Sequence, residues 1–197
     1  MKEKSRQKVM QLYFSLVKHC ANNGAGIIAS GVFYDGNNIT IATNEGLFKS
    51  IDSGKTFSAF TTTGIPTGEV IWHFSAAKSG NTTRFICITA SIADVYNGLM
   101  PYDYYGFAKG VYVMDNLNGN WVAKSAGINF NSDYIMYSGM AQNDVNTIYL
   151  AGSDEALNAP LIFKSIDGGN SWNKVFKSTN NQNVITGWSG YQGDKNW

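Results

Sequence analysis

The chain has 197 residues, of which 15% are charged and 14% aromatic, and its formal net charge is +1. With 44% hydrophobic residues the chain is too apolar to stay disordered, and a net charge near zero argues against nucleic-acid binding by phosphate neutralisation. No apolar run approaches the roughly 18 residues of a membrane-spanning helix. Low charge with many glycine and aromatic residues is typical of short strands and tight turns, which favours an all-β fold.

Residues 1–25 form a leader that is basic at its start and mostly apolar from Val9 to Val17. A secretory signal peptide has this order of regions, but it also needs a small-residue cleavage site, and here lysine, histidine and cysteine follow. An amphipathic helix or an irregular segment is therefore the preferred interpretation. The two cysteines and two histidines are too scattered to predict a metal site, and no cofactor is expected. Cys87 lies in an apolar strand pattern and is predicted to be a buried free thiol.

One motif occurs twice and a divergent copy lies between the two. Residues 47–57 read LFKSIDSGKTF, residues 162–172 read IFKSIDGGNSW, and residues 111–121 read VYVMDNLNGNW. In all three copies the first aromatic precedes the last by nine residues. This spacing places Asn116 where the other copies have Asp52 and Asp167.

The motif predicts a β-hairpin. An aspartate accepts hydrogen bonds from the N–H groups of a turn, and glycine tolerates positive φ there. Asn116 can form the same kind of local bond, so the divergent copy is expected to keep the turn. A structural role is preferred over a catalytic or metal-binding one for the motif residues, which are Ser50, Asp52, Gly54, Phe57, Asn116, Trp121, Ser165, Asp167, Gly169 and Trp172.

Each motif closes a unit of four successive strand patterns. Four antiparallel strands with a fixed motif in the last hairpin describe a β-propeller blade. The predicted fold is therefore an incomplete ring of about three blades plus the first strand of a fourth. The boundaries are residues 26–60 for the first blade, 61–126 for the second, 127–178 for the third and 179–197 for the start of the fourth.

The motif resembles the Asp box, also called the bacterial neuraminidase repeat, whose pattern is Ser-x-Asp-x-Gly-x-Thr-Trp. Asp boxes occur in sialidases, sortilin-type receptors, xyloglucan-hydrolysing enzymes and a photosystem assembly factor, all of which are propellers. The resemblance covers about residues 26–197 and implies a propeller, and it implies an extracytoplasmic or secreted location because most members of the family are found there. It implies little about function, because enzymes and binding proteins share this turn.

Asp-box propellers usually have six to ten blades, so three blades cannot close the ring. The arc would leave two open blade faces, and apolar faces of that size aggregate or bind partners. The expected partners are the remaining blades of a longer protein, of which this chain is a fragment, or other copies of the chain.

The loops opposite the motif hairpins are the candidate ligand site. In the second unit this loop is long and combines acids with tyrosines, and in the third it carries two further acids. Aromatic rings stack on sugar rings and carboxylates bind hydroxyls, while a carboxylate pair could also hydrolyse a glycoside. Alternatively, the long loop packs over its own blade. The ligand-binding candidates are Tyr96, Tyr102, Tyr104 and Tyr105, and the catalytic candidates are Asp94, Asp103, Asp154 and Glu155.

Three functions stay open. The first is a non-catalytic propeller segment that binds a protein or a glycan through the loop face. The second is a fragment of a secreted glycoside hydrolase that resembles xyloglucanases, and the third is an assembly-factor propeller. Sialidase chemistry is excluded, because sialidases of this family hold the substrate with three arginines and this chain has only Arg6 and Arg84.

Overall fold

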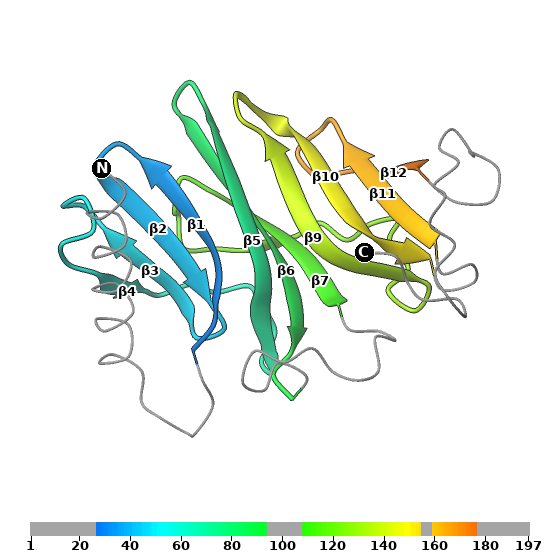
Figure 1. Cartoon of the computed structure of the whole chain (residues 1–197), viewed down its shortest axis with the longest axis horizontal. Helices are drawn as coiled ribbons and strands as arrows, with labels where there is room; N and C mark the ends of the chain where they lie inside the picture. Colours follow the sequence, from blue (N-terminus) through cyan, green and yellow to red (C-terminus); the bar gives the residue numbers. More distant parts are fainter. Residues whose placement is uncertain (1–26, 94–107, 155–158, 177–197) are drawn as a thin grey trace.

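The computed structural model describes residues 27–93, 108–154 and 159–176, which form three β-sheets (Figure 1). In each sheet four consecutive strands pair antiparallel in chain order. This confirms the predicted all-β fold of four-stranded antiparallel blades. The described residues contain no helix that is long and apolar enough to cross a membrane. The predicted leader, residues 1–25, and the predicted start of a fourth blade, residues 179–197, lie outside the described residues.

The three sheets are referred to as blades 1, 2 and 3. Blade 1 contains β1 (Ala29–Asp35), β2 (Asn38–Thr43), β3 (Gly46–Ser50) and β4 (Ser58–Phe60). Blade 2 contains β5 (Glu69–Ser79), β6 (Thr82–Ser91), β7 (Ala108–Asp115) and β8 (Val122–Ala123). Blade 3 contains β9 (Asp133–Ala141), β10 (Asp144–Asp154), β11 (Ala159–Ser165) and β12 (Asn173–Phe176).

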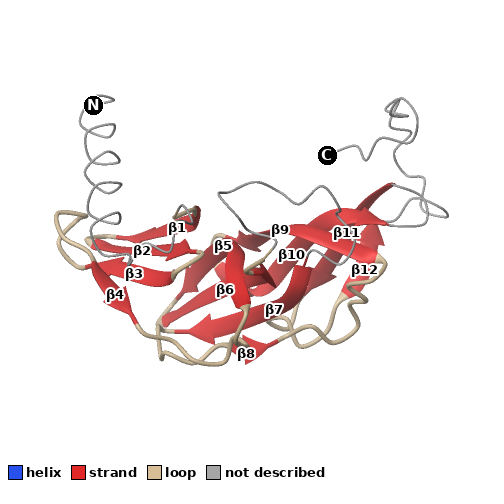
Figure 2. Cartoon of the chain, turned by 90° about the horizontal axis from the view of Figure 1, so that it is seen from below, coloured by secondary structure: helices blue, strands red, loops and turns tan. Residues whose placement is uncertain are grey.

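The blades are arranged as an arc around their first strands. β5 contacts β1 on one side and β9 on the other, and the sheets fan out from these strands (Figures 1 and 2). Each blade has two faces, and the pairing of its strands shows which residues occupy equivalent positions in the three blades. Ile41 pairs with Phe48 in blade 1, Cys87 with Tyr112 in blade 2, and Leu150 with Phe163 in blade 3.

We call the face that carries the two motif aromatics the rear face of a blade. It contains Phe85, Cys87, Tyr112 and Trp121 in blade 2, and Ile148, Leu150, Phe163 and Trp172 in blade 3. The opposite, front face contains Ala42 and Leu47 in blade 1, and Ile86, Ile88, Val111 and Val113 in blade 2. The rear face of each later blade packs on the front face of the blade before it, so the core lies between the blades.

Two polar side chains are buried or half-buried in the blades, and the first of them, Cys87, behaves as the sequence predicted. Cys87 is a free, fully buried thiol, and burial raises its pKa well above the usual value. His73 on β5 accepts a hydrogen bond at Nδ1 from the backbone N–H of Ser138 on β9, at 3.1 Å. Burial lowers the pKa of His73, so the neutral ring ties the first strands of blades 2 and 3 together.

Candidate functional site

The turn after β3 is organised by two side chains of the motif. The Ser50 hydroxyl donates to Asp52 Oδ1 at 2.7 Å and accepts the N–H of Gly54 at 2.9 Å. Asp52 Oδ1 also accepts the N–H groups of Lys55 and Thr56, each at 3.0 Å, and Asp52 Oδ2 accepts the Thr56 hydroxyl at 2.7 Å. Both carboxylate oxygens are therefore engaged inside their own turn.

The turn after β11 repeats this arrangement. Ser165 donates to Asp167 Oδ1 at 2.8 Å and accepts the N–H of Gly169 at 2.8 Å. Asp167 also accepts the N–H of Ser171 at 2.9 Å and the Ser171 hydroxyl at 2.6 Å. Each turn follows the third strand of its own blade, and both turns lie at the same end of the blades. The register shows this, because Ser50 pairs with Ile39 and Ser165 with Ile148 at equivalent positions.

These hydrogen bonds decide what the two carboxylates can do. The N–H and hydroxyl of Thr56, followed by the Ser50 hydroxyl, hold the pKa of Asp52 well below its usual range. The hydroxyl and N–H of Ser171, followed by the Ser165 hydroxyl, lower the pKa of Asp167 to about 2. Carboxylates held so strongly in the ionised form cannot act as general acids near neutral pH. Their contribution is to the geometry of the turn.

The divergent copy differs from its expected structure. Asn116 does not bond within its own turn, since its Oδ1 accepts the backbone N–H of Thr83 on the neighbouring strand at 2.8 Å. The positive-φ pair lies at Asn116 and Leu117 (54° and 50°), one place earlier than Ser53 and Gly54 (61° and 82°). Met114 stands at the position of Ser50, so no hydroxyl is present to organise the turn. The prediction of a local bond at Asn116 is therefore wrong, and the reason is a turn shifted by one residue.

The lowered pKa values of the turn aspartates predict a specific acid sensitivity. Because each folded-state pKa lies below the unfolded-state value of about 3.9, the ionised carboxylates stabilise the fold above that pH. This stabilisation is lost as the pH falls from about 4 through about 2, where Asp167 takes up its proton in the folded state. We expect the urea midpoint of the wild type to fall over this range more steeply than that of the Asp52→Asn/Asp167→Asn variant. Parallel curves for the two proteins would contradict the assignment.

The junction between blades 2 and 3 is closed by an arginine at the end that carries the motif turns. Arg84 on β6 binds both carboxylate oxygens of Asp115 at 2.8 Å. Its Nη1 reaches across to blade 3 and donates to the Val145 carbonyl oxygen at 3.2 Å and to Asn146 Oδ1 at 3.0 Å. A small pocket of about 160 Å³ lies beside this clamp.

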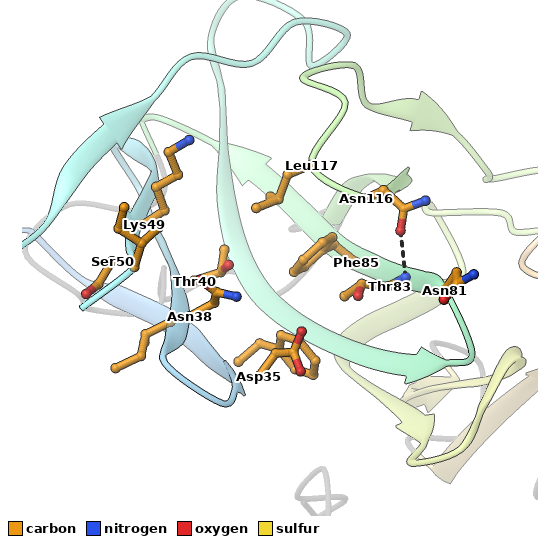
Figure 3. Close-up of a pocket in the computed structure, with 13 residues that line it drawn as sticks. Asp35, Asn38, Thr40, Lys49, Ser50, Asn81, Thr83, Phe85, Asn116 and Leu117 are labelled. Carbon is orange, nitrogen blue, oxygen red and sulfur yellow. Dashed lines mark hydrogen bonds between the residues drawn. The ribbon is translucent and has the colours of Figure 1, made fainter. Parts of the chain in front are cut away.

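The equivalent junction between blades 1 and 2 has no such clamp and is hollowed (Figure 3). Strand register places Asn38 and Ile51 where blade 2 has Arg84 and Asp115. Because neither side chain spans the junction, a pocket of about 400 Å³ opens there. We call it the junction pocket. It is lined by Phe33, Asp35, Asn38, Ile39, Thr40, Lys49, Ser50, Ile51, Asn81, Thr83, Phe85, Asn116 and Leu117.

The junction pocket combines an aromatic wall with amide and hydroxyl groups and one lysine, Lys49. The rings of Phe33 and Phe85 meet edge to face, with centroids 5.7 Å apart. The amide side chains of Asn38 and Asn81 are exposed at the rim. Asp35 is paired with Lys78 at 2.6 Å, which offsets its charge. Rings beside amides and hydroxyls can bind a neutral polyhydroxylated ligand or a segment of peptide.

At the opposite end of the blades, the described residues contain two acids that the sequence analysis missed. Glu69 begins β5 and Asp133 begins β9, at equivalent positions opposite Ser91 and Asp154. Glu69 accepts the Thr89 hydroxyl at 2.6 Å and the Tyr112 hydroxyl at 3.3 Å, while Asp133, which is 2% exposed, pairs with Lys174 at 2.6 Å. Burial and the nearby Glu69 raise the pKa of Tyr112 to about 12. Both acids are thus bound to side chains of their own blades. Their position at the first residue of the first strand of a blade was the sequence signal that could have identified them.

Most of the residues predicted for the loop face belong to segments outside the described residues. Asp94, Tyr96, Tyr102, Asp103, Tyr104, Tyr105 and Glu155 lie outside the described residues. Asp154 is the last residue of β10, so its backbone sits at the predicted loop end of blade 3. Within the described ranges no group of three or more His, Cys, Asp or Glu side chains is placed to hold a metal ion.

No protein-family model matches the chain, and no curated protein matches it. Among solved structures it is similar to a GH74 xyloglucanase from Xanthomonas campestris (13% identity, TM-score 0.49, 76% of this chain). It is also similar to an ancestral GH74 enzyme (19% identity, TM-score 0.49, 79% of this chain) and to YCF48 bound to D1 peptide (14% identity, TM-score 0.37, 79% of this chain). The chain spans 21% and 19% of the two GH74 chains and 55% of the YCF48 chain.

Proposed function

We propose that this chain is a non-catalytic segment of an Asp-box β-propeller, and that it binds a glycan or a protein as part of a larger extracytoplasmic protein. The remaining blades of that protein, or other copies of the chain, are its structural partners. The observation that carries the non-catalytic assignment is the state of the turn aspartates. Every oxygen of Asp52 and Asp167 accepts a hydrogen bond from its own turn, so these acids serve the scaffold.

The ligand surface has two candidate places in this proposal. One is the loop face, where the tyrosine-rich segment between β6 and β7 supplies Tyr96, Tyr102, Tyr104 and Tyr105. The other is the junction pocket, whose aromatic wall and neutral rim groups suit the faces and hydroxyls of a sugar. A glycan is the ligand class that both places have in common.

Two variants distinguish these places. Asn38→Arg/Ile51→Asp copies the Arg84–Asp115 clamp into the first junction and fills the junction pocket without touching the loops. Tyr102→Ala/Tyr105→Ala removes two rings from the loop and leaves the pocket intact. Binding of xyloglucan and β-glucan oligosaccharides is measured by calorimetry for each variant. We expect the variant at the true site to weaken binding at least about tenfold, or 1.4 kcal/mol. Unchanged binding in both variants, or no binding by the wild type, would contradict glycan binding at these two places and leave a protein as the proposed ligand.

A fragment of a xyloglucanase-like hydrolase is the alternative, and an assembly-factor propeller is the third possibility. The alternative requires acids in the loops, where Asp94, Asp103, Asp154 and Glu155 are the candidates. Release of reducing sugar from xyloglucan that is lost in Asp103→Ala or Asp154→Ala would establish it in place of the non-catalytic proposal.

A further inference from the structure

The middle of the rear face of blade 1 is buried, although neither of the other two blades lies on it. It carries Ile39, Ile41, Phe48 and Phe57, which are 9%, 0%, 5% and 8% exposed. Among the described residues these four form a cluster by themselves, without an apolar neighbour from another blade. Side chains in the middle of an open sheet face would keep part of their surface accessible. Burial this deep requires a cover over the centre of this face.

The equivalent faces show what such a cover replaces. In blade 2 the rear face receives Ala42 and Leu47 from blade 1, and in blade 3 it receives Ile86, Ile88, Val111 and Val113 from blade 2. The rear face of blade 1 has the same pattern of aliphatic and aromatic residues at the same register positions. It is thus built to receive a preceding blade.

The cover is narrower than a blade. Val32 and Tyr34 on β1 pair with Ile41 and Ile39 and share their face, yet they are 40% and 64% exposed. The residue of blade 2 that corresponds to Val32 is Phe74, which pairs with Cys87 and is only 4% exposed under blade 1. A complete sheet would bury the whole rear face in this way. A single short segment would cover the middle of the face and leave β1 open.

We propose that residues 9–17 of this chain cover the rear face of blade 1 and take the place of a preceding blade. Their sequence, VMQLYFSLV, offers seven apolar or aromatic side chains and lies between Lys8 and Lys18. Residues 18–28 connect this segment to β1, and eleven residues reach up to about 35 Å. A four-stranded sheet is only about 15 Å across, so the segment can reach the middle of the face.

The proposal has a consequence for assembly that goes beyond the proposed function. With the rear face of blade 1 covered, a further blade or a second copy can dock only on the front face of blade 3. That face still exposes Tyr137 and Tyr149, at 48% and 39%. The arc is then closed at one end and extendable at the other.

Thiol reactivity tests the cover in the full-length chain. A reporter thiol is introduced by Ile41→Cys in a Cys20→Ser background, with Val32→Cys as the matched reporter on the open part of the same face. Each reporter is combined with Leu12→Asp/Phe14→Asp, which makes the apolar side of the segment polar, or with Gln11→Asp/Ser15→Asp, which adds the same charge at polar positions. Intact mass confirms that residues 9–17 are present, and the rate of reaction with a disulfide reagent is measured without denaturant.

We expect the thiol at position 41 to react slowly in the background chain and about tenfold or more faster with Leu12→Asp/Phe14→Asp. Gln11→Asp/Ser15→Asp should leave the rate unchanged, and the thiol at position 32 should react fast throughout. The fully buried Cys87 reports global opening, and its slow rate should be the same in every variant if the substitutions uncover only the rear face of blade 1. If Cys87 and the thiol at position 41 accelerated together, the substitutions would be opening the whole fold, which would overturn the proposal. Equal rates with both pairs of substitutions would overturn the proposal. So would protection that disappears on dilution, which would assign the cover to a second copy, or protection in a chain that lacks residues 9–17.

Discussion

Replacing Phe163 by alanine is expected to lower the free energy of unfolding by about 4 kcal/mol. Phe163 is 1% exposed and lies in the cluster that joins the front face of blade 2 to the rear face of blade 3. Truncation removes apolar contacts and leaves a cavity that two rigid sheets cannot close. Because single domains have only about 5 to 15 kcal/mol of stability, a large part of the total would be lost. Urea unfolding followed by circular dichroism measures the difference.

Ile166→Ala supplies the matched control on the same strand-to-turn segment. Ile166 is three residues away and 68% exposed, so its truncation should change the free energy of unfolding by less than about 0.5 kcal/mol. If the two substitutions had similar effects, the junction between the blades would not be the source of stability. A large effect of Phe163→Ala alone would show that the cluster between blades 2 and 3 stabilises the fold.

The local parts of this fold could be predicted from the sequence. The Ser50–Asp52 and Ser165–Asp167 pairs act within a few residues of chain, so their turn chemistry is encoded next to the strands that they join. Strand alternation and the motif spacing gave the four-stranded units for the same reason. The divergent copy shows the limit of this reasoning, because it has Met114 in place of the serine and its turn at Asn116 is shifted by one residue.

The candidate site depended on contacts that are distant in sequence. The junction pocket exists because Asn38 and Ile51 face blade 2 where Arg84 and Asp115 face blade 3, and this comparison needs the strand register of two different blades. Arg84 was considered only as a member of an absent arginine triad, whereas its partners Asp115 and Asn146 lie 31 and 62 residues away. Residue types alone did not indicate that Arg84 closes one junction and that the other stays open.

The front face of blade 3, at one end of the arc, resembles the front face of blade 1, on which blade 2 packs. The front face of blade 3 carries Tyr149, Ala151, Ile162 and Lys164 at the positions of Thr40, Ala42, Leu47 and Lys49 in blade 1. In both blades the lysine lies near an aromatic ring, 5.0 Å from Phe60 for Lys49 and 5.6 Å from Tyr149 for Lys164. The front face of blade 1 holds blade 2, so the similar face of blade 3 is suited to a further blade.

Replacing Gly152 by alanine is expected to lower the free energy of unfolding by about 3 kcal/mol, an effect close to that of removing a core aromatic side chain. Gly152 lies in the middle of β10, opposite Ile135 at a register irregularity between β9 and β10. A Cβ at this position would overlap the backbone carbonyl oxygen of Tyr134 and lie 2.9 Å from the Cα of Ile135. Since the obstacle is backbone of the paired strand and not a flexible side chain, the two strands must separate locally.

Gly139 on β9 provides the opposite case for this prediction. It pairs with Tyr149 of the same β10 strand, but a Cβ there meets nothing within 4 Å. Alanine loses less backbone entropy than glycine on folding, so Gly139→Ala should be neutral or stabilising by up to about 1 kcal/mol. Comparing the thermal midpoints of the two variants isolates the close approach of the strands from the general effect of adding a methyl group. Equal thermal midpoints would mean that β9 and β10 leave room for a methyl group at Gly152. The register irregularity opposite Ile135 would then not be the reason for a glycine at this position.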